Sequence, residues 1–148
     1  MEIERKFLVK QLPENLDQYT SLLIEQAYLC TYPVVRIRRQ DDEYILTYKG
    51  KGQMVREEYN LPLNQEAYEH LLEKADGNVI RKRRTCIPYP PYTIELDLFD
   101  APFEGLVIAE VEFPTEVDAV AFIPPEWFGK DVTFEKEYHN SYLSRKKV

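Results

Sequence analysis

The sequence predicts an α+β protein that is mainly β-structure and folds as a single domain over residues 1–148. Three observations predict this class. Apolar and polar residues alternate with a period of two in at least seven stretches, which is typical of half-buried strands. Helical patterns fit only between or after these stretches, and no linker or low-complexity tract divides the chain. A length of 148 residues is enough for one domain with a substantial core.

The alternating stretches are expected to form the strands. They cover residues 2–9, 34–40, 43–49, 55–63, 79–87, 92–100 and 106–113, and 24–30 is a possible eighth. Gly50 and Gly52 predict a hairpin turn after the third stretch. The prolines of PYPPY (residues 88–92) predict a rigid loop that interrupts pairing between two strands.

Three other segments are expected to be helical. Residues 64–76 carry apolar side chains on one face, begin at Asn64 as a possible N-cap and are followed by Gly77 as a stop signal. Thr115 to Asp118 resembles a capping box, so a short helix is predicted up to Phe122. The tail at 135–147 is expected to form a last helix, whose Tyr138 and Tyr142 lie four residues apart and could stack on the wall formed by the strands.

Composition and charge argue against several functions. The formal net charge of −7 disfavours general nucleic-acid binding, which needs a basic surface. No apolar run approaches the roughly 20 residues of a membrane span, and the N-terminus has no apolar segment of an export signal. The two cysteines are too few for a disulfide framework and predict reduced thiols in the cytoplasm. The histidines and cysteines show no zinc-site spacing.

Charged residues are concentrated on one side of most predicted strands, and apolar residues occupy the other side. Two arrangements explain this pattern. In one, the apolar faces form a sandwich core and the charges face water, which is the usual outcome. In the other, the strands close into a barrel whose charges face a water-filled lumen, and helices or a second chain cover the apolar outside. The pattern alone leaves both arrangements open.

Three features favour a lumen. Acidic and basic residues are segregated by strand, as Glu-x-Glu at 2–4 and 110–112 and as Arg-x-Arg at 36–38 and Lys-x-Arg at 82–84, whereas a solvated surface mixes the two signs. Carboxylates two apart on a strand share one face at roughly 6.5–7 Å and can share a divalent cation. Desolvation of so many charges would cost several kcal/mol each, which a wet channel avoids.

The residue types in such a lumen indicate the ligand. Oxygen donors without histidine or thiolate ligands favour Mg²⁺ or Mn²⁺. Several arginines and lysines favour a polyanion, since a guanidinium group binds phosphate oxygens bidentately. A metal and a polyanion together indicate a triphosphate or polyphosphate chain. The chain has no Gly-x-x-x-x-Gly-Lys-Ser/Thr loop, so it is not a P-loop protein.

The segment MEIERKFLV resembles the Glu-x-Glu-x-Lys signature of the CYTH family, also called triphosphate tunnel metalloenzymes. The similarity continues through IEQAYL, VRIRR, LTYKG, RKRR, IELDLF, AEVEF and AFIPPEWFGKDVT followed by YHN. The short bacterial inorganic triphosphatases look most similar. This resemblance implies a closed eight-stranded antiparallel β-barrel, the triphosphate tunnel, with helices packed outside.

The resemblance also implies roles for individual residues. Glu2, Glu4, Lys6 and Tyr28 are the expected catalytic residues, with Tyr28 paired with Lys6. The expected substrate-binding residues are Lys6, Arg36, Arg38, Lys49, Arg56, Glu58, Lys82 and Arg84, and the expected metal ligands are Glu2, Glu4, Asp97, Glu110 and Glu112. Arg56 and Glu58 could instead form a structural ion pair. Asn60 stands where the family pattern leads us to expect another tunnel glutamate.

The predicted reaction is hydrolysis of inorganic tripolyphosphate to pyrophosphate and phosphate, with Mg²⁺ or Mn²⁺ as Lewis acid and a water oriented by Glu2 or Glu4 as nucleophile. The enzymatic alternatives are a class IV-type adenylyl cyclase and a nucleotide or thiamine triphosphatase. The non-enzymatic alternatives are a polyphosphate-binding module and a structural sandwich. A homodimer is possible because apolar residues face outward in the barrel arrangement.

Overall fold

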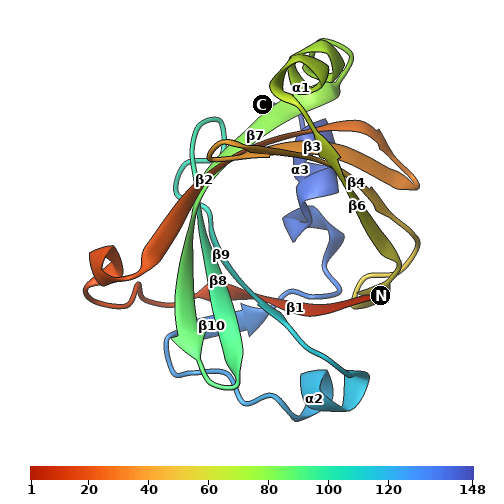
Figure 1. Cartoon of the computed structure of the whole chain (residues 1–148). Helices are drawn as coiled ribbons and strands as arrows, with labels where there is room; N and C mark the ends of the chain where they lie inside the picture. The colour runs from red at the N-terminus through yellow and green to blue at the C-terminus, as the bar shows by residue number, and fades with distance from the viewer.

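The chain folds into one continuous antiparallel sheet that curls into a nearly closed barrel (Figure 1). The computed structural model describes all residues 1–148. The strands are β1 Glu2–Val9, β2 Thr20–Thr31, β3 Val34–Gln40, β4 Glu43–Lys49, β5 Val55–Arg56, β6 Glu58–Leu63, β7 Asp76–Tyr89, β8 Tyr92–Phe99, β9 Val107–Glu112 and β10 Phe128–Asp131. The helices are α1 Gln65–Leu72, α2 Glu116–Ala121 and α3 Asn140–Arg145, with 3₁₀ turns at Leu16–Gln18 and Lys136–Tyr138.

The ring of strands confirms the predicted barrel. Its order is β1-β9-β8-β7-β2-β3-β4-β6, and β10 adds to the other edge of β1. β5 and β6 together occupy the predicted strand 55–63 and are separated only by Glu57, so the ring has eight strands when they are counted as one. β5 closes the ring by pairing with β1, at Glu2 with Arg56 and Ile3 with Val55.

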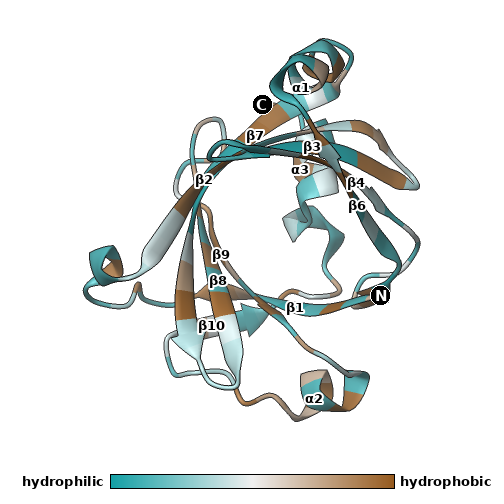
Figure 2. Cartoon of the chain, viewed as in Figure 1, coloured by the Kyte–Doolittle hydropathy of each residue, from teal (hydrophilic) through white to brown (hydrophobic).

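The barrel is inverted relative to an ordinary core, since its charges face inward and its apolar residues face outward. Hydrophobic and hydrophilic residues alternate along its strands (Figure 2). One outer cluster, which contains Phe7, Leu96 and Val111, is covered by α2 and by Phe128 of β10. A second outer cluster, formed by Ala27 and Ile37, is covered by Tyr68 of α1. These helices supply the apolar contacts that a barrel with a polar interior cannot make internally.

α3 takes a different place from the other helices. α1 and α2 lie outside the ring in Figure 1, whereas α3 lies within its outline. Leu143 of α3 packs against Ile80 and Ile108, which stand two residues before the inward-facing Lys82 and Glu110. An apolar plug thus occupies one end of the lumen on the β7 and β9 side. The expected packing of the tail on the barrel wall is found for Tyr138, which packs against this cluster, but the contact is with the inner side of the wall and not with its outside.

The boundaries of two predicted elements also differ. Asn64 caps α1 by accepting a hydrogen bond from the Ala67 amide, but the helix ends at Leu72 and Gly77 lies in β7. Gly77 has φ +74°, and a Cβ there would lie 1.9 Å from the Ser144 carbonyl oxygen, so its role is close approach to α3. Pro88 and Tyr89 pair with β8, which reduces the predicted loop to a tight turn at Pro90 and Pro91.

Arg5 is the one charged residue on the outer face of β1, and the fold explains it. Its guanidinium donates a hydrogen bond to the Ala119 carbonyl of α2, pairs with Asp131 at 2.8 Å and lies over the Phe7 ring. Arg5 therefore joins α2, β10 and β1. The capping box of α2 is confirmed, because the Thr115 hydroxyl accepts a hydrogen bond from the Asp118 amide. Both cysteines are free thiols, and none of the helices is long and apolar enough to span a bilayer.

Candidate active site

The lumen contains a charged cavity of ≈ 220 Å³, called the tunnel below. Six carboxylates and six cationic side chains line it, so the formal charges of the two sets cancel. The carboxylates are Glu2, Glu4, Glu58, Glu95, Glu110 and Glu112, and the cations are Lys6, Arg36, Arg38, Lys49, Arg56 and Arg84. Only three hydrophobic residues line the tunnel. A cavity this polar is suited to an ionic ligand rather than to an apolar one.

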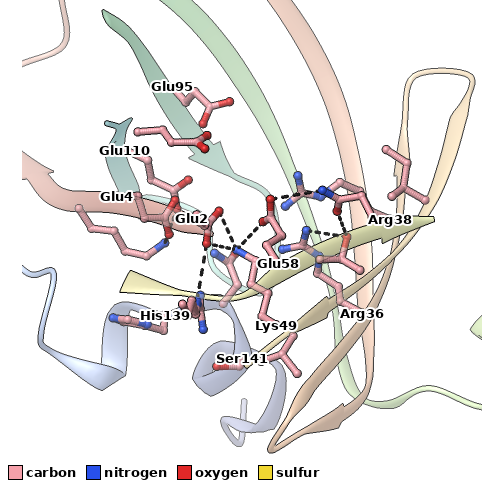
Figure 3. A pocket seen from close by; sticks show the side chains of 18 of the residues that line it. Glu2, Glu4, Arg36, Arg38, Lys49, Glu58, Glu95, Glu110, His139 and Ser141 are labelled. Carbon is pink, nitrogen blue, oxygen red and sulfur yellow. Dashed lines mark hydrogen bonds and ion pairs between the residues drawn. The ribbon is translucent and has the colours of Figure 1, made fainter. Parts of the chain in front are cut away.

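Five of the six carboxylates form one wall of the tunnel, on β1, β8 and β9, and Glu58 lies on β6. Sheet register pairs Glu4 with Glu112, and Glu110 with both Lys6 and Glu95. The facing wall belongs to β3 and carries Arg36 and Arg38, as Figure 3 shows. Opposing walls follow from the alternation of each strand, because residues two apart project to the same side. The closed ring then brings glutamates and arginines from distant parts of the sequence to one cavity.

Lys6 stands among the glutamates and is paired with them. Its ammonium group donates a hydrogen bond to Glu110 and lies 3.7 Å from Glu4. Burial opposes the charge, but Glu110 and Glu4 more than compensate and hold the pKa of Lys6 well above its usual range. Lys6 is therefore a permanent cation. No hydrogen bond joins it to Tyr28, which is buried in the tunnel wall, so the predicted Lys6–Tyr28 pair is not formed in this structure.

Lys82, Arg84 and Asp97 form a buried ionic cluster behind the tunnel surface. Asp97 is fully buried and accepts two hydrogen bonds from Arg84, at 2.8 and 2.9 Å, while Lys82 approaches it at 2.7 Å. Burial opposes ionisation of Asp97, but Arg84 and Lys82 lower its pKa. Neither Asp97 nor Lys82 lines the tunnel, whereas Arg84 reaches it and contacts Glu110 at 3.0 Å. This geometry gives Asp97 a direct role in fixing Arg84.

A chain of hydrogen bonds connects the arginine wall to the glutamate wall. Arg36 donates to the Thr47 hydroxyl at 3.3 Å, and that hydroxyl donates to the Asn60 side-chain oxygen at 2.7 Å. The Asn60 amide nitrogen donates to Glu58 at 3.3 Å. Glu58 is 3.4 Å from Lys49, whose ammonium group donates to Glu2 at 2.8 Å. Asn60 acts here as acceptor and donor at once, which a glutamate carboxylate cannot do.

Arginine side chains of β3 and β5 have nitrogens without a hydrogen-bond partner. Arg36 Nε is buried without a hydrogen-bond partner, and so is Arg56 Nε, which lies 3.6 Å from Glu2. Arg38 bonds to the neutral Gln26 at 2.8 Å rather than to a carboxylate. Burial, Arg36 and Arg84 together lower the pKa of Arg38 to about 9, so it is still charged at neutral pH. Unpaired buried donors of this kind are expected where an anion binds. Arg56 and Glu58 form no ion pair with each other, so that structural alternative is not supported.

The carboxylates differ in how far the protein itself neutralises them. Glu110 contacts Lys6 and Arg84, and these cations keep its pKa well below the usual range although burial opposes them. Glu112 has no cationic partner, and its pKa is raised by burial and by Glu2, Glu58 and Glu4. The pKa of Glu95 is likewise raised, by burial and by Glu110, despite its contact with Arg84. Glu112 therefore has no compensating cation, and Glu4 has only the 3.7 Å contact with Lys6, which Lys6 shares with Glu110.

This donor set fits a hard divalent cation. It offers carboxylate oxygens only, with unscreened repulsion that a cation would relieve. The acids are spread along the wall, and no group of three or more acid, histidine or cysteine side chains converges on a point. A cation held here therefore needs oxygens from a second source, and a bound phosphate chain is a suitable one because Mg²⁺ usually combines one or two carboxylates with substrate phosphates.

Three tunnel residues escaped the sequence analysis because they belong to the tail. His139, Asn140 and Ser141 line the tunnel next to the apolar plug. His139 Nε2 donates a hydrogen bond to the Thr133 carbonyl at 2.8 Å, and burial and Lys6 lower its pKa, so its imidazole is neutral. Asn140 accepts a hydrogen bond from Lys82 at 3.2 Å. His139 and Asn140 belong to the YHN segment of the family resemblance, but the resemblance assigned no role to them.

The fold and site define a class of protein, namely a nearly closed antiparallel barrel with a polar lumen between ionic walls. The chain belongs to the CYTH family, whose domain model matches residues 1–145. It is 38% identical over 148 residues to an inorganic triphosphatase of Nitrosomonas europaea, covering 97% of this chain and 96% of that one. It is 39% identical over 153 residues to an inorganic triphosphatase of Acetivibrio thermocellus, covering 96% and 92%.

A solved structure agrees with these relatives. The crystal structure of an inorganic triphosphatase superposes with a TM-score of 0.73 at 35% sequence identity, covering 99% of this chain and 96% of the other. The similarity spans the whole barrel, so it includes the strands that form both walls of the tunnel.

Proposed function

We propose that this chain is a divalent-metal-dependent phosphoanhydride hydrolase that converts inorganic tripolyphosphate to pyrophosphate and phosphate inside the tunnel. One observation carries the proposal. Carboxylates of β1 and β9, of which Glu112 has no cationic partner, face arginines of β3 and β5 across a single cavity, and the buried Nε atoms of Arg36 and Arg56 have no hydrogen-bond partner. A metal ion and a triphosphate chain would satisfy both walls at once, and relatives that match nearly the full chain are inorganic triphosphatases.

The proposed metal ligands are Glu2, Glu4, Glu110 and Glu112, with Glu4 and Glu112 as the most available pair. When bound, Mg²⁺ or Mn²⁺ would neutralise phosphate oxygens and activate the attacking water. Asp97 is proposed to hold Arg84 in place instead of binding metal, because Arg84 and Lys82 already occupy its oxygens.

The remaining residues supply positioning and charge. Arg36, Arg38 and Arg84 would hold the phosphate chain and stabilise the equatorial oxygens of a loose transition state. Lys6, Lys49 and Arg56 add cationic charge near the same oxygens. Because Lys6 stays protonated, we assign it to orienting the terminal phosphate rather than to proton transfer. Glu2 or Glu4 would orient the attacking water, and its proton would pass to a tunnel carboxylate oxygen that the metal does not occupy.

The test is a substrate panel with the purified protein. Tripolyphosphate, ATP and thiamine triphosphate are incubated separately with Mg²⁺ or Mn²⁺, and phosphate, pyrophosphate and cyclic AMP are measured. We expect one phosphate and one pyrophosphate from each tripolyphosphate, and no cyclic AMP. Glu4→Gln should lower this activity by about a hundredfold or more while circular dichroism stays unchanged. Metal-dependent binding without turnover would instead indicate a binding module.

The protein is further proposed to be a cytoplasmic homodimer. Its two free thiols favour the cytoplasm. A homodimer is favoured by apolar side chains left exposed on the barrel, such as Tyr59 and Leu61 of β6. Light scattering during gel filtration measures the mass directly, and a monomer at micromolar concentration would contradict the dimer.

A further inference from the structure

A second cavity adjoins the tunnel and is called the vestibule below. Its volume is ≈ 460 Å³, and it lies between α3, the β2–β3 turn and the turn that follows β4. It shares Val34, Arg56, His139 and Ser141 with the tunnel lining. Because the same four side chains border both spaces, the vestibule is the continuation of the tunnel at its α3 end.

The vestibule is basic, in contrast to the balanced tunnel. Its charged lining residues are Lys51, Arg56, Lys136 and Arg145, with no aspartate or glutamate among them. The whole chain carries a formal charge of −7, so a pocket without acids is a departure from the average surface.

Three of these cations have no carboxylate partner. Lys51, Lys136 and Arg145 are exposed and take part in none of the ion pairs of the molecule. Lys51 instead lies over the ring of Tyr32, with 5.7 Å between its ammonium nitrogen and the ring centroid. Like charges gathered around one hollow repel each other unless an anion lies between them.

The opposite end of the tunnel has the opposite charge. A third cavity there shares Glu95 and Glu112 with the tunnel, and these two glutamates are its only charged lining residues. The tunnel therefore runs from an acidic mouth to a basic one. A polyanion that is too long for the tunnel is repelled at the acidic mouth and attracted at the basic one.

We propose that the vestibule binds the phosphates of an inorganic polyphosphate chain that extend beyond the tunnel when the chain has more than three units. This inference rests on the proposed function, since it extends the same tunnel to a longer substrate of the same chemistry. Lys51, Lys136 and Arg145 provide the added contacts, and Arg56 joins them to the tunnel. The reaction is unchanged: water attacks phosphorus, one phosphoanhydride bond breaks, and the shortened chain leaves as the anion.

The experiment compares a vestibule variant with a matched charge control. The vestibule variant carries Lys51→Gln, Lys136→Gln and Arg145→Gln. The control carries Lys10→Gln, Lys74→Gln and Arg83→Gln, which removes the same charge from exposed residues that line none of the three cavities described here. We measure kcat/KM with tripolyphosphate, with a medium-length polyphosphate fraction and with ATP. We expect the vestibule variant to lose about tenfold on polyphosphate, and both variants to keep tripolyphosphate activity.

Several results would overturn the proposal. One is a vestibule variant whose kcat/KM falls equally on tripolyphosphate and polyphosphate, or does not fall on polyphosphate. Another is an equal fall in kcat/KM for the vestibule variant and the control. A fall confined to ATP would indicate a nucleoside site at Tyr32 and Tyr142. Calorimetric titration of polyphosphate in the presence of a chelator separates this inference from the proposed function. If the wild type hydrolyses nothing but binds polyphosphate about tenfold more tightly than the vestibule variant does, the vestibule stands and the hydrolase assignment fails.

Discussion

Replacement of Asp97 with Asn should destabilise the fold strongly, because it removes the only carboxylate that Lys82 contacts. Asp97 is fully buried, Lys82 is 1% exposed and Arg84 is 6% exposed. Loss of one partner from a buried ionic cluster costs about 3–5 kcal/mol, since the remaining charges stay buried and unpaired. For a domain of this size, 1 kcal/mol corresponds to roughly 2–4 °C in Tm. We therefore expect a decrease of about 10 °C.

The assay is thermal unfolding followed by circular dichroism in the presence of a chelator, so that metal binding does not contribute. Glu95→Gln is the matched control, because it lies two residues away on the same strand and contacts the same arginine at 3.1 Å. Its pKa is raised by burial and by Glu110, so loss of its charge should change Tm little or raise it. Equal decreases for both variants would refute the assignment. So would a stable Asp97→Asn protein that no longer binds metal.

The pH dependence gives an internal check on the same cluster. The folded-state pKa of Asp97 is lowered, so the stability it provides is present above its unfolded pKa of about 3.9. That stability is lost as the pH falls through the lower folded-state value. The Tm difference between wild type and Asp97→Asn should be constant above about pH 5 and shrink below about pH 4.

Three further predictions concern the tunnel. The Asn60→Asp variant cannot donate a hydrogen bond to Glu58, so we expect its KM for tripolyphosphate to rise about tenfold and its kcat to change less. The Asn60→Ala variant should show a smaller rise in KM, because it adds no charge. An unchanged KM for Asn60→Asp would contradict this prediction. The increase in Tm caused by saturating Mg²⁺ should shrink as the pH falls, and the decline should begin above the usual titration range of glutamate, because the pKa of Glu112 is raised. An increase in Tm that stays constant with pH would exclude Glu112 as a ligand. The Arg38→Gln variant should have a KM for tripolyphosphate that is roughly tenfold higher or more, because it loses a charged contact with phosphate. Steady-state kinetics measure this KM, and an unaltered value would place the substrate elsewhere.

The charged side of each strand could be predicted because strand geometry has a strict period of two. Glu2, Glu4, Arg36 and Arg38 all face the tunnel as that period requires. The same period could not tell which inward-facing residues reach the cavity. Asp97 faces inward, but its neighbours Lys82 and Arg84 enclose it, and this depends on pairing between β7 and β8 that the alternation does not specify.

The side of the barrel wall that the tail contacts could not be predicted, for a related reason. The apolar residues of the tail fit an outer helix, and only the apolar lumen residues Ile80 and Ile108 create an inner surface for Leu143. Those residues fall within strands whose inward positions are otherwise charged, so their hydrophobicity looked like a local exception. This tertiary contact alone places His139 and Ser141 at the tunnel and Arg145 at the vestibule.

The central claim is that both walls of the tunnel hold one metal–triphosphate assembly. Anomalous diffraction from crystals soaked with Mn²⁺ and tripolyphosphate tests it most directly. We predict a manganese peak beside Glu4 and Glu112 in the lumen, with phosphate density that extends from it to Arg36 and Arg38. Manganese on the outer surface of the barrel, or phosphate that touches neither arginine, would contradict the claim.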